Sequence, residues 1–236
     1  GWTTADAEPL IPQTALMGMS KPMVFDGVDD RVDKTGTDST DIDAVTRTGN
    51  YSVSTWINVN KMQDCNIWSH RTASDSRLGL SLHNNGTLVF EAYNGSGYSG
   101  KSGTISSGKL YHVMCTEDSG TMVLYINGAV QSGTSVNQFQ ANTTDNYLQI
   151  GYESTGTSKF FSGIINELAI WDSVLTLAEV QAIFNDGVAL DVSSDSGDYE
   201  SSGDLVGYWR NTGTGTWTDR SANSNDGTVA GSPDTI

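Results

Sequence analysis

Residues 78–92 of the chain read LGLSLHNNGTLVFEA. Leucines occupy every second position at first, and Leu88, Phe90 and Ala92 resume the alternation after a polar break. This period of two predicts two strands that each present one apolar face. The turn Asn84-Asn85-Gly86 supplies residues that tolerate positive φ, as a tight hairpin requires. The stretch therefore predicts an antiparallel β-hairpin with one face in a core.

The same alternation extends outward from this hairpin in both directions. Tyr51–Val59 alternates apolar and polar side chains, and Asn127-Gly128 marks a second hairpin turn. Ile164–Trp171 and Leu205–Trp209 predict further strands. The chain has 236 residues, of which 26 are Gly and 4 are Pro, a balance typical of many short strands joined by tight turns. We therefore predict an all-β fold, a two-sheet antiparallel β-sandwich.

One segment predicts a helix. Thr176 can cap its start and Glu179 can close a capping box. Leu177, Val180, Ile183 and Phe184 would share one face, and Gly187 is the expected stop. The two cysteines, Cys65 and Cys115, predict a buried free thiol at Cys115, which lies in an apolar run; a disulfide between them is the alternative.

The charge is one-sided, with 12 Lys and Arg against 28 Asp and Glu and a net charge of -16. Such a surface repels nucleic-acid phosphates and anionic membranes, so we expect neither as a partner. No stretch of the sequence is apolar over the length that a membrane-spanning helix needs. The acidity itself indicates a soluble surface.

The chain divides into four parts. Residues 1–22, with three prolines, predict an extended arm that either docks on a neighbouring subunit or frays. Residues 23–190 hold the sandwich and its helix. Residues 191–204 are acidic and predict a solvated linker, because their spacing does not match a calcium-binding EF-hand loop. Residues 205–236 supply further strands.

Several of these segments resemble the laminin-G-like, concanavalin-A-like jelly-roll superfamily. The similar segments, all between residues 23 and 187, are Phe25–Val32 (FDGVDDRV), Tyr51–Ile57 (YSVSTWI), Tyr111–Val113 with Leu124–Gly128 (LYING), Phe161–Trp171 (FSGIINELAIW) and Leu175–Phe184. Each motif is weak alone, but their shared order is specific for the fold. It is not specific for a function, because this fold hosts many.

The C-terminal segment resembles the lead-in that normally precedes the first of these motifs. Leu205–Trp209 and the later Thr218–Thr228 carry this likeness. In this chain they follow the helix, which indicates either a circular permutation or the start of a second module. An apolar strand left unpaired is costly, so we expect residues 205–236 to complete the sandwich, in their own subunit or in a neighbour.

The resemblance also implies a structural calcium site. The oxygen ligands to test are Asp26, Asp29, Asp30 and Asn166, although Asn166 stands where the family usually has Asp and Arg31 replaces its usual aromatic residue. Calcium needs about six to eight oxygens, and a neutral amide is a weaker ligand than a carboxylate. The alternative is that Asp29 and Asp30 only shape a turn.

Catalytic motifs are missing from the sequence. No strand carries two closely spaced carboxylates, as glycoside hydrolases of this fold do, and Glu91, Glu117 and Glu167 are isolated. We therefore expect no enzyme. A sugar site would use aromatic platforms, and the candidate aromatics lie in turn-rich stretches: Trp68, Tyr93, Tyr98 and Tyr152. Packing at the sandwich edge is the alternative for each of them.

Two functions follow from these patterns. The first is a non-enzymatic virion protein, a capsid decoration or tail-fibre protein, because the Ser-, Thr-, Asn- and Gly-rich style resembles laminin-G-like proteins of marine tailed phages. It would bind other virion proteins or itself, as a homo-oligomer. The second is a secreted bacterial carbohydrate-binding module with a glycan ligand, either with or without a calcium requirement. The predicted location is accordingly the virion or the extracellular space.

Overall fold

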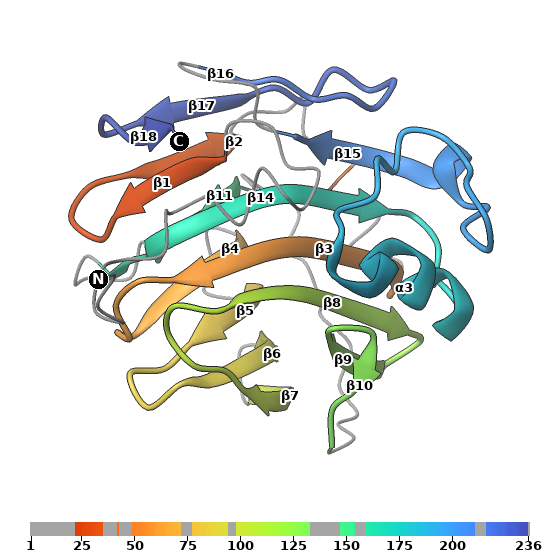
Figure 1. Cartoon of the computed structure of the whole chain (residues 1–236), viewed down its shortest axis with the longest axis horizontal. Helices are drawn as coiled ribbons and strands as arrows, with labels where there is room; N and C mark the ends of the chain where they lie inside the picture. The colour runs from red at the N-terminus through yellow and green to blue at the C-terminus, as the bar shows by residue number, and fades with distance from the viewer. Residues whose placement is uncertain are drawn as a thin grey trace, which may run out of the picture.

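The computed structural model describes residues 22–34, 42, 49–71, 77–93, 98–132, 147–153, 159–210 and 216–235. They form two stacked antiparallel sheets, a two-stranded ribbon and one short α-helix, as predicted. In Figure 1 the sheet that contains β14, β3 and β8 faces the viewer, and the strands β4 to β7 lie behind it.

The front sheet is built around two ten-residue strands that pair with each other. Its order is β10 (Ala129–Val130), β9 (Thr121–Ile126), β8 (Leu110–Asp118), β3 (Asn50–Val59), β14 (Ser162–Trp171), β1 (Met23–Asp26) and β18 (Asp234–Thr235), with β15 (Leu205–Trp209) also on β14.

The back sheet draws its strands from both halves of the chain. Its order is β16 (Thr216–Trp217), β17 (Gly227–Ala230), β2 (Arg31–Lys34), β11 (Tyr147–Ile150), β4 (Cys65–Arg71), β5 (Arg77–Leu82), β6 (Thr87–Tyr93) and β7 (Tyr98–Thr104). The separate ribbon pairs β12 (Tyr152–Glu153) with β13 (Lys159–Phe160).

The hairpin predicted from residues 78–92 is β5 and β6. Their apolar side chains point between the sheets, where Leu80 and Phe90 are fully buried. His83 N donates to Thr87 O at 2.8 Å to close the turn, and Gly86 adopts a φ of +84°. Cys65 and Cys115 are both buried, and neither is part of a disulfide, which confirms the predicted buried thiol at Cys115.

Helix α3 (Leu177–Phe184) begins with the predicted capping box between Thr176 and Glu179. It ends earlier than expected, because Asn185 adopts the left-handed conformation and opens a 3₁₀ turn, η2 (Asn185–Gly187). Val180 and Ile183 are buried against the front sheet, whereas Leu177 is 47% exposed and does not share their face. The helix covers the outer side of the sheet at the right of Figure 1.

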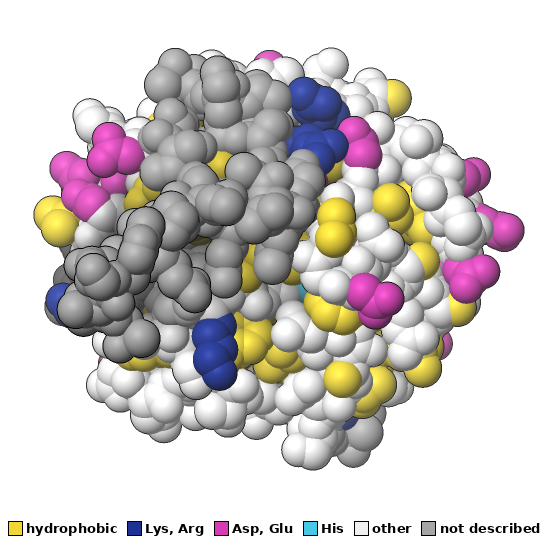
Figure 2. Space-filling model, in the orientation of Figure 1, with side chains coloured by type: hydrophobic (Ala, Val, Ile, Leu, Met, Phe, Trp, Pro, Cys, Tyr) yellow, Lys and Arg dark blue, Asp and Glu magenta, His cyan; other side chains and the backbone are white. Residues whose placement is uncertain are grey.

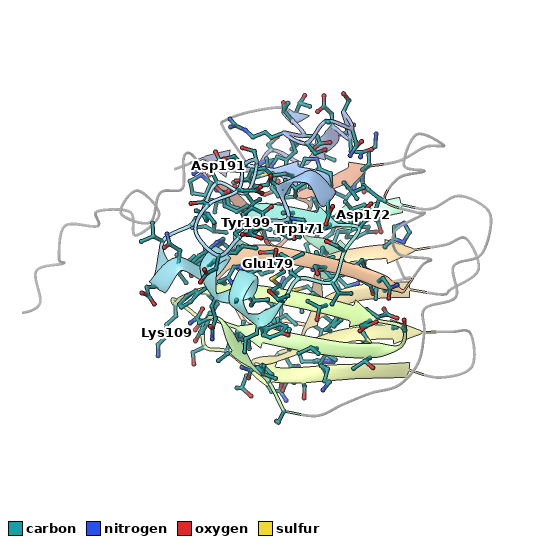
Figure 3. All side chains as sticks on the ribbon, turned by 90° about the vertical axis from the view of Figure 1, so that its right-hand side faces the viewer. Lys109, Trp171, Asp172, Glu179, Asp191 and Tyr199 are labelled. Atoms are coloured by element: carbon teal, nitrogen blue, oxygen red, sulfur yellow. The ribbon has the colours of Figure 1, made fainter. Side chains whose placement is uncertain are left out.

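Residues 191–204, which end in the 3₁₀ turn η3 (Ser202–Asp204), are mostly exposed, but two of their side chains anchor them to the sandwich. Val192 and Tyr199 are buried in the cluster beneath α3. Trp171 Nε1 donates to the Tyr199 hydroxyl, which donates to Val192 O, both at 2.9 Å. Figure 3 shows Trp171 and Tyr199 side by side. The acidic composition of the segment predicts exposure, and the burial of Val192 and Tyr199 could not be predicted from it.

Acidic side chains lie on the surface of the described residues, as the sequence predicts. Figure 2 shows acidic side chains scattered around the rim of one face and hydrophobic side chains in small separate patches. None of the helices in the described ranges is both long enough and apolar enough to cross a membrane.

The two ends of the chain share one edge of β14. Residues 162–165 of β14 pair with β1, and residues 168–171 pair with β15. Between these two partners Glu167 adopts a φ of +53° at an irregularity in the register. Because β17 also pairs with β2 in the back sheet, the C-terminal strands contribute to both layers. Trp209 and Trp217 bring their side chains into the core.

A buried polar cluster lies where β14 meets β15. Tyr208 donates its hydroxyl hydrogen to Glu167 Oε2. Arg210 places Nε 2.9 Å from Glu167 Oε1 and Nη1 2.8 Å from Asp191 Oδ2. Burial raises the pKa of Glu167 to about 7, although Tyr208 and Arg210 oppose the rise. Glu167 therefore takes up a proton near neutral pH in the folded protein.

Removal of residues 205–236 is expected to prevent folding. The deletion leaves half an edge of β14 unpaired and removes Trp209 and Trp217 from the core, where loss of one large aromatic side chain typically costs about 3–5 kcal/mol. Soluble yield and urea unfolding measure the effect. A deletion of residues 1–21, which keeps every described strand, is the control. A soluble 1–204 fragment that unfolds cooperatively would contradict the assignment of these strands to the sandwich.

The proton on Glu167 should make stability depend on pH. The folded pKa of about 7 exceeds the ordinary value of 4.5, so this contribution is complete below pH 4.5 and is lost as pH rises through 7. The free energy of unfolding of Glu167→Gln, minus that of wild type, should rise by up to about 3 kcal/mol across this window. Urea unfolding at several pH values measures it, with exposed Glu200→Gln as control. Parallel profiles for wild type and Glu167→Gln would refute the effect.

Candidate binding sites

A polar groove of about 190 Å³ opens at one end of the back sheet, where β13 lies near β4, β5 and β6. The residues that line it come from four strands and two loops: Asp64, Cys65, Asn66, Ser81, Leu82, His83, Glu91 and Lys159. Six of these eight side chains end in a polar or charged group, so the groove suits a ligand rich in hydrogen-bonding groups.

The floor of the groove is a row of hydrogen-bonded side chains. Ser81 faces away from the core because Leu80 and Leu82, its neighbours on β5, face into it. Asn66 lies opposite Ser81, and it faces out of the core because its neighbours Cys65 and Ile67 face into it. Ser81 Oγ lies 2.9 Å from Asn66 Oδ1 and 2.5 Å from Glu91 Oε1. Ser81 has one hydroxyl hydrogen, so it donates to Asn66 Oδ1 or to Glu91 Oε1, and the three side chains are in contact on the floor.

The rim of the groove is more exposed. The side chains of Asp64 and His83 are 48% and 51% exposed, and His83 Nδ1 lies 3.8 Å from Asp64 Oδ1. Asp64 Oδ1 also accepts a hydrogen bond of 2.9 Å from Asn84 N. Lys159 approaches from the β12–β13 ribbon. The groove thus combines acceptors of fixed position with one ammonium group.

Sequence reasoning missed this groove. Glu91 reads as an isolated carboxylate, and Asp64 and Lys159 are separated by most of the domain. The available signal was the alternation itself, since it places Ser81 and Glu91 on the outward faces of β5 and β6. Nothing in the local sequence, however, predicts that the β12–β13 ribbon brings Lys159 to the same place.

The acidic turn after β1 is a second candidate site. One carboxylate oxygen from each of Asp26, Asp29 and Asp30 lies within 4.8 Å of the others, close enough to hold one metal ion. Asp26 Oδ1 accepts hydrogen bonds from Val28 N at 2.7 Å and Asp29 N at 3.2 Å. Asp30, only 2% exposed, accepts from Asp26 N at 2.9 Å and from Ser232 N at 2.8 Å.

The electrostatics of the turn reflect these bonds. Burial alone would raise the pKa of Asp26, but hydrogen bonds from backbone N–H groups outweigh it and lower that pKa. Burial raises the pKa of Asp30, with help from the charges of Asp26 and Asp29. Two of the three carboxylates therefore already serve the protein's own backbone. With one oxygen from each residue, the three supply only half of the smallest calcium shell of about six oxygens.

Asn166 does not belong to this cluster. Asp26 pairs with Ser162, whereas Asn166 lies four residues further along β14, opposite Trp56. At roughly 3.3 Å per residue the two positions are about 13 Å apart. Asn166 is fully buried, and its carbonyl oxygen accepts a hydrogen bond from Thr55 Oγ1. Asn166 cannot share one ion with the acidic turn, because the register of β1 on β14 places the two motifs too far apart.

The predicted aromatic platforms have separate outcomes. Trp68 is 2% exposed and belongs to the core, so it offers no face to a ligand. Tyr152 is half-buried, stacks on Phe160 at 4.7 Å and has the Arg31 guanidinium 5.6 Å from its ring centroid. The side chains of the other two, Tyr93 and Tyr98, lie outside the described residues, although their backbones pair between β6 and β7.

His112 has a structural role. It is fully buried beneath α3, where its ring lies near Trp56 and Phe184. His112 Nε2 and Ser54 Oγ share a hydrogen bond of 2.7 Å. Burial lowers the pKa of His112 to about 3, so the imidazole is neutral at physiological pH. The Ser–His contact is covered by the helix and is not open to a substrate.

Comparison with solved structures supports the fold. A candidate carbohydrate-binding protein from Bacteroides ovatus superposes with a TM-score of 0.64 at 18% identity, covering 93% of this chain and 60% of its own. A heptameric SAP-like pentraxin from Limulus polyphemus superposes with a TM-score of 0.52 at 20% identity, covering 72% of this chain and 83% of its own. This chain thus spans about three fifths of the Bacteroides protein.

No curated protein sequence matches the chain significantly. A family model does match residues 33–181, which is more than half of the chain. Those residues include β14, the first half of the helix and all of the groove, whereas β1 and the C-terminal strands lie outside the match. The chain belongs to the concanavalin A-like lectin/glucanases superfamily.

Proposed function

We propose that the chain is a carbohydrate-binding module and that its binding site is the groove between β13 and the strands β4, β5 and β6. The observation that carries the proposal is the convergence of Asn66, Ser81 and Glu91 on one floor, with Lys159 at the side. Sugar hydroxyls both donate and accept hydrogen bonds, and this floor presents carboxylate, amide and hydroxyl groups at fixed positions. The Bacteroides protein of similar fold, to which carbohydrate binding is ascribed, lends support.

The charge and size of the groove narrow the ligand to neutral sugars. The net charge of -16 and the carboxylates of Asp64 and Glu91 disfavour sulfated, uronic and sialic saccharides. About 190 Å³ is small compared with pockets that bury drug-sized ligands. The groove therefore fits one sugar ring, such as the end of a chain, and we expect weak affinity for a single site.

We propose binding without turnover. Asp64 and Glu91 share the groove, and a carboxylate pair is the equipment of a glycosidase. Glu91, however, is hydrogen-bonded into the floor through Ser81, and Asp64 is exposed at the rim beside His83. The general acid of such enzymes usually lies in a buried, apolar pocket, whereas the side chain of Asp64 is 48% exposed.

The virion hypothesis rests on the style of the sequence and stays a prediction. It is compatible with a sugar-binding groove, since a particle-borne module can bind glycans. Co-purification with phage particles at a fixed copy number would support it, and a free secreted protein would not.

The first prediction from this proposal concerns sugar binding. On an array of neutral and acidic saccharides the protein should bind a subset of the neutral ones. Glu91→Ala should weaken that binding roughly 10- to 100-fold, the effect of losing one charged hydrogen-bond partner. Exposed Glu200→Ala is the matched control and should bind as wild type does. Calorimetry of the best saccharide gives the affinities, and thermal unfolding checks that both variants are folded.

Three results would count against the proposal. Flat signals across the whole array would remove the lectin function. Unchanged affinity in Glu91→Ala would move the site elsewhere. Release of reducing sugar from bound oligosaccharides would show turnover and make the protein an enzyme.

The second prediction concerns calcium. We propose that the acidic turn acts through its hydrogen bonds and needs no ion for sugar binding. Asp30→Ala removes the acceptor of two part-buried hydrogen bonds, from Asp26 N and Ser232 N, and should cost about 0.5–1.5 kcal/mol per bond. Asp29→Asn, which keeps those bonds, should unfold at the wild-type temperature. Thermal unfolding with EDTA and with calcium tests this, since a bound ion would raise the midpoint in proportion to its occupancy. A calcium-dependent rise in wild type that Asp29→Asn abolishes would establish a metal site instead.

A further inference from the structure

The two sides of the groove come from segments about ninety residues apart in sequence. Asp64 lies in the loop between β3 and β4, and Lys159 lies on the ribbon strand β13. The ribbon is short, with only two register pairs between β12 and β13. Its base is held by Phe161 N, which donates to Gly151 O at 2.8 Å. The position of Lys159 therefore depends on contacts beyond the ribbon itself.

Gln63 supplies such a contact. Its side-chain Nε2 donates a hydrogen bond to Phe160 O. Phe160 directly follows Lys159, and Gln63 directly precedes Asp64. One side chain thus joins the backbone neighbours of two residues that line the groove.

The same amide group also reaches the turn after β1. Gln63 Nε2 lies 3.5 Å from Gly27 O, at the outer limit of a hydrogen bond. A carboxamide nitrogen carries two hydrogens, so it can serve both carbonyl oxygens. Gly27 leaves room for it, because a Cβ there would lie 3.1 Å from Nε2 and 2.9 Å from Ser162 Cβ. Gly27 also adopts a φ of +81°, which favours glycine.

We infer that Gln63 is a positioning residue for the groove. It ties the β12–β13 ribbon to the loop that carries Asp64 and so sets the separation of Lys159 and Asp64. The inference rests on the proposed function for its effect on sugar affinity, but its structural part, the tie between Gln63 and the ribbon, does not.

The most informative variants remove the Nε2 donor of Gln63 and keep the length of its side chain. Gln63→Glu places carboxylate oxygens against the two carbonyl oxygens, and Gln63→Met keeps the length without a donor. Asn223 offers a matched control. Its Nδ2 donates to Leu205 O and Val206 O on β15, each at 3.1 Å, and none of these residues lines the groove. Asn223→Asp makes the same chemical change as Gln63→Glu without touching the groove.

The experiment measures saccharide affinity and hydrogen exchange together. Gln63→Glu and Gln63→Met should weaken sugar binding about fivefold or more, whereas Asn223→Asp should bind as wild type does. Hydrogen exchange of the segment around Lys159–Phe161 should be faster in both Gln63 variants and unchanged in Asn223→Asp. Because Gln63 acts through Lys159, its substitution should have little further effect in a Lys159→Ala background.

Other outcomes would overturn the inference. Wild-type affinity in both Gln63 variants, or full additivity with Lys159→Ala, would show that Gln63 does not position the groove. If the wild-type protein binds no saccharide, the proposed function fails. Hydrogen exchange then decides alone, and unchanged exchange around Lys159–Phe161 in both Gln63 variants would remove the tie as well.

Discussion

Strand β14 pairs along both of its edges and is buried along all ten residues. One edge belongs to β3, and the other is divided between β1 from the start of the chain and β15 from its end. The irregularity at Glu167 lies where one partner gives way to the next. Since unpaired backbone groups in a buried strand are costly, neither end of the described chain is dispensable for the front sheet.

The groove depends on the same strand. The pairing of Asp26 with Ser162 brings the turn at Gly27 next to the start of β14, and the ribbon strand β13 ends two residues before that start. Gln63 contacts both of these segments. The position of Lys159 at the groove therefore depends on the contacts at the start of β14. These contacts connect the groove directly to the core of the sandwich.

Much of the fold could be predicted from local patterns. Alternation in Tyr51–Val59 and in residues 78–92, the turn glycines and the capping box of α3 each determine a structure within a few residues of themselves. Patterns failed where the outcome depends on distant partners. Tyr199 is buried within an acidic segment because Trp171 lies beneath it, and Trp68 is in the core although turn-rich sequence surrounds it.

The candidate site was harder to predict for the same reason. Asn66, Ser81, Glu91 and Lys159 have no shared motif, and only the register of β4, β5 and β6 with the approach of β13 brings them together. The family resemblance instead grouped Asn166 with the acidic turn, whereas the register of β1 on β14 keeps these two parts of the chain apart. The family resemblance was enough to predict the architecture, whereas the groove could be recognised only in the three-dimensional structure.

The most direct test of the account is a crystal structure of the protein soaked with the neutral saccharide that it binds best. The account predicts electron density for one sugar ring in the groove, with ring hydroxyls within hydrogen-bonding distance of Asn66, Glu91 and Lys159. Density for the sugar on another face of the sandwich, with this groove filled only by solvent, would contradict it.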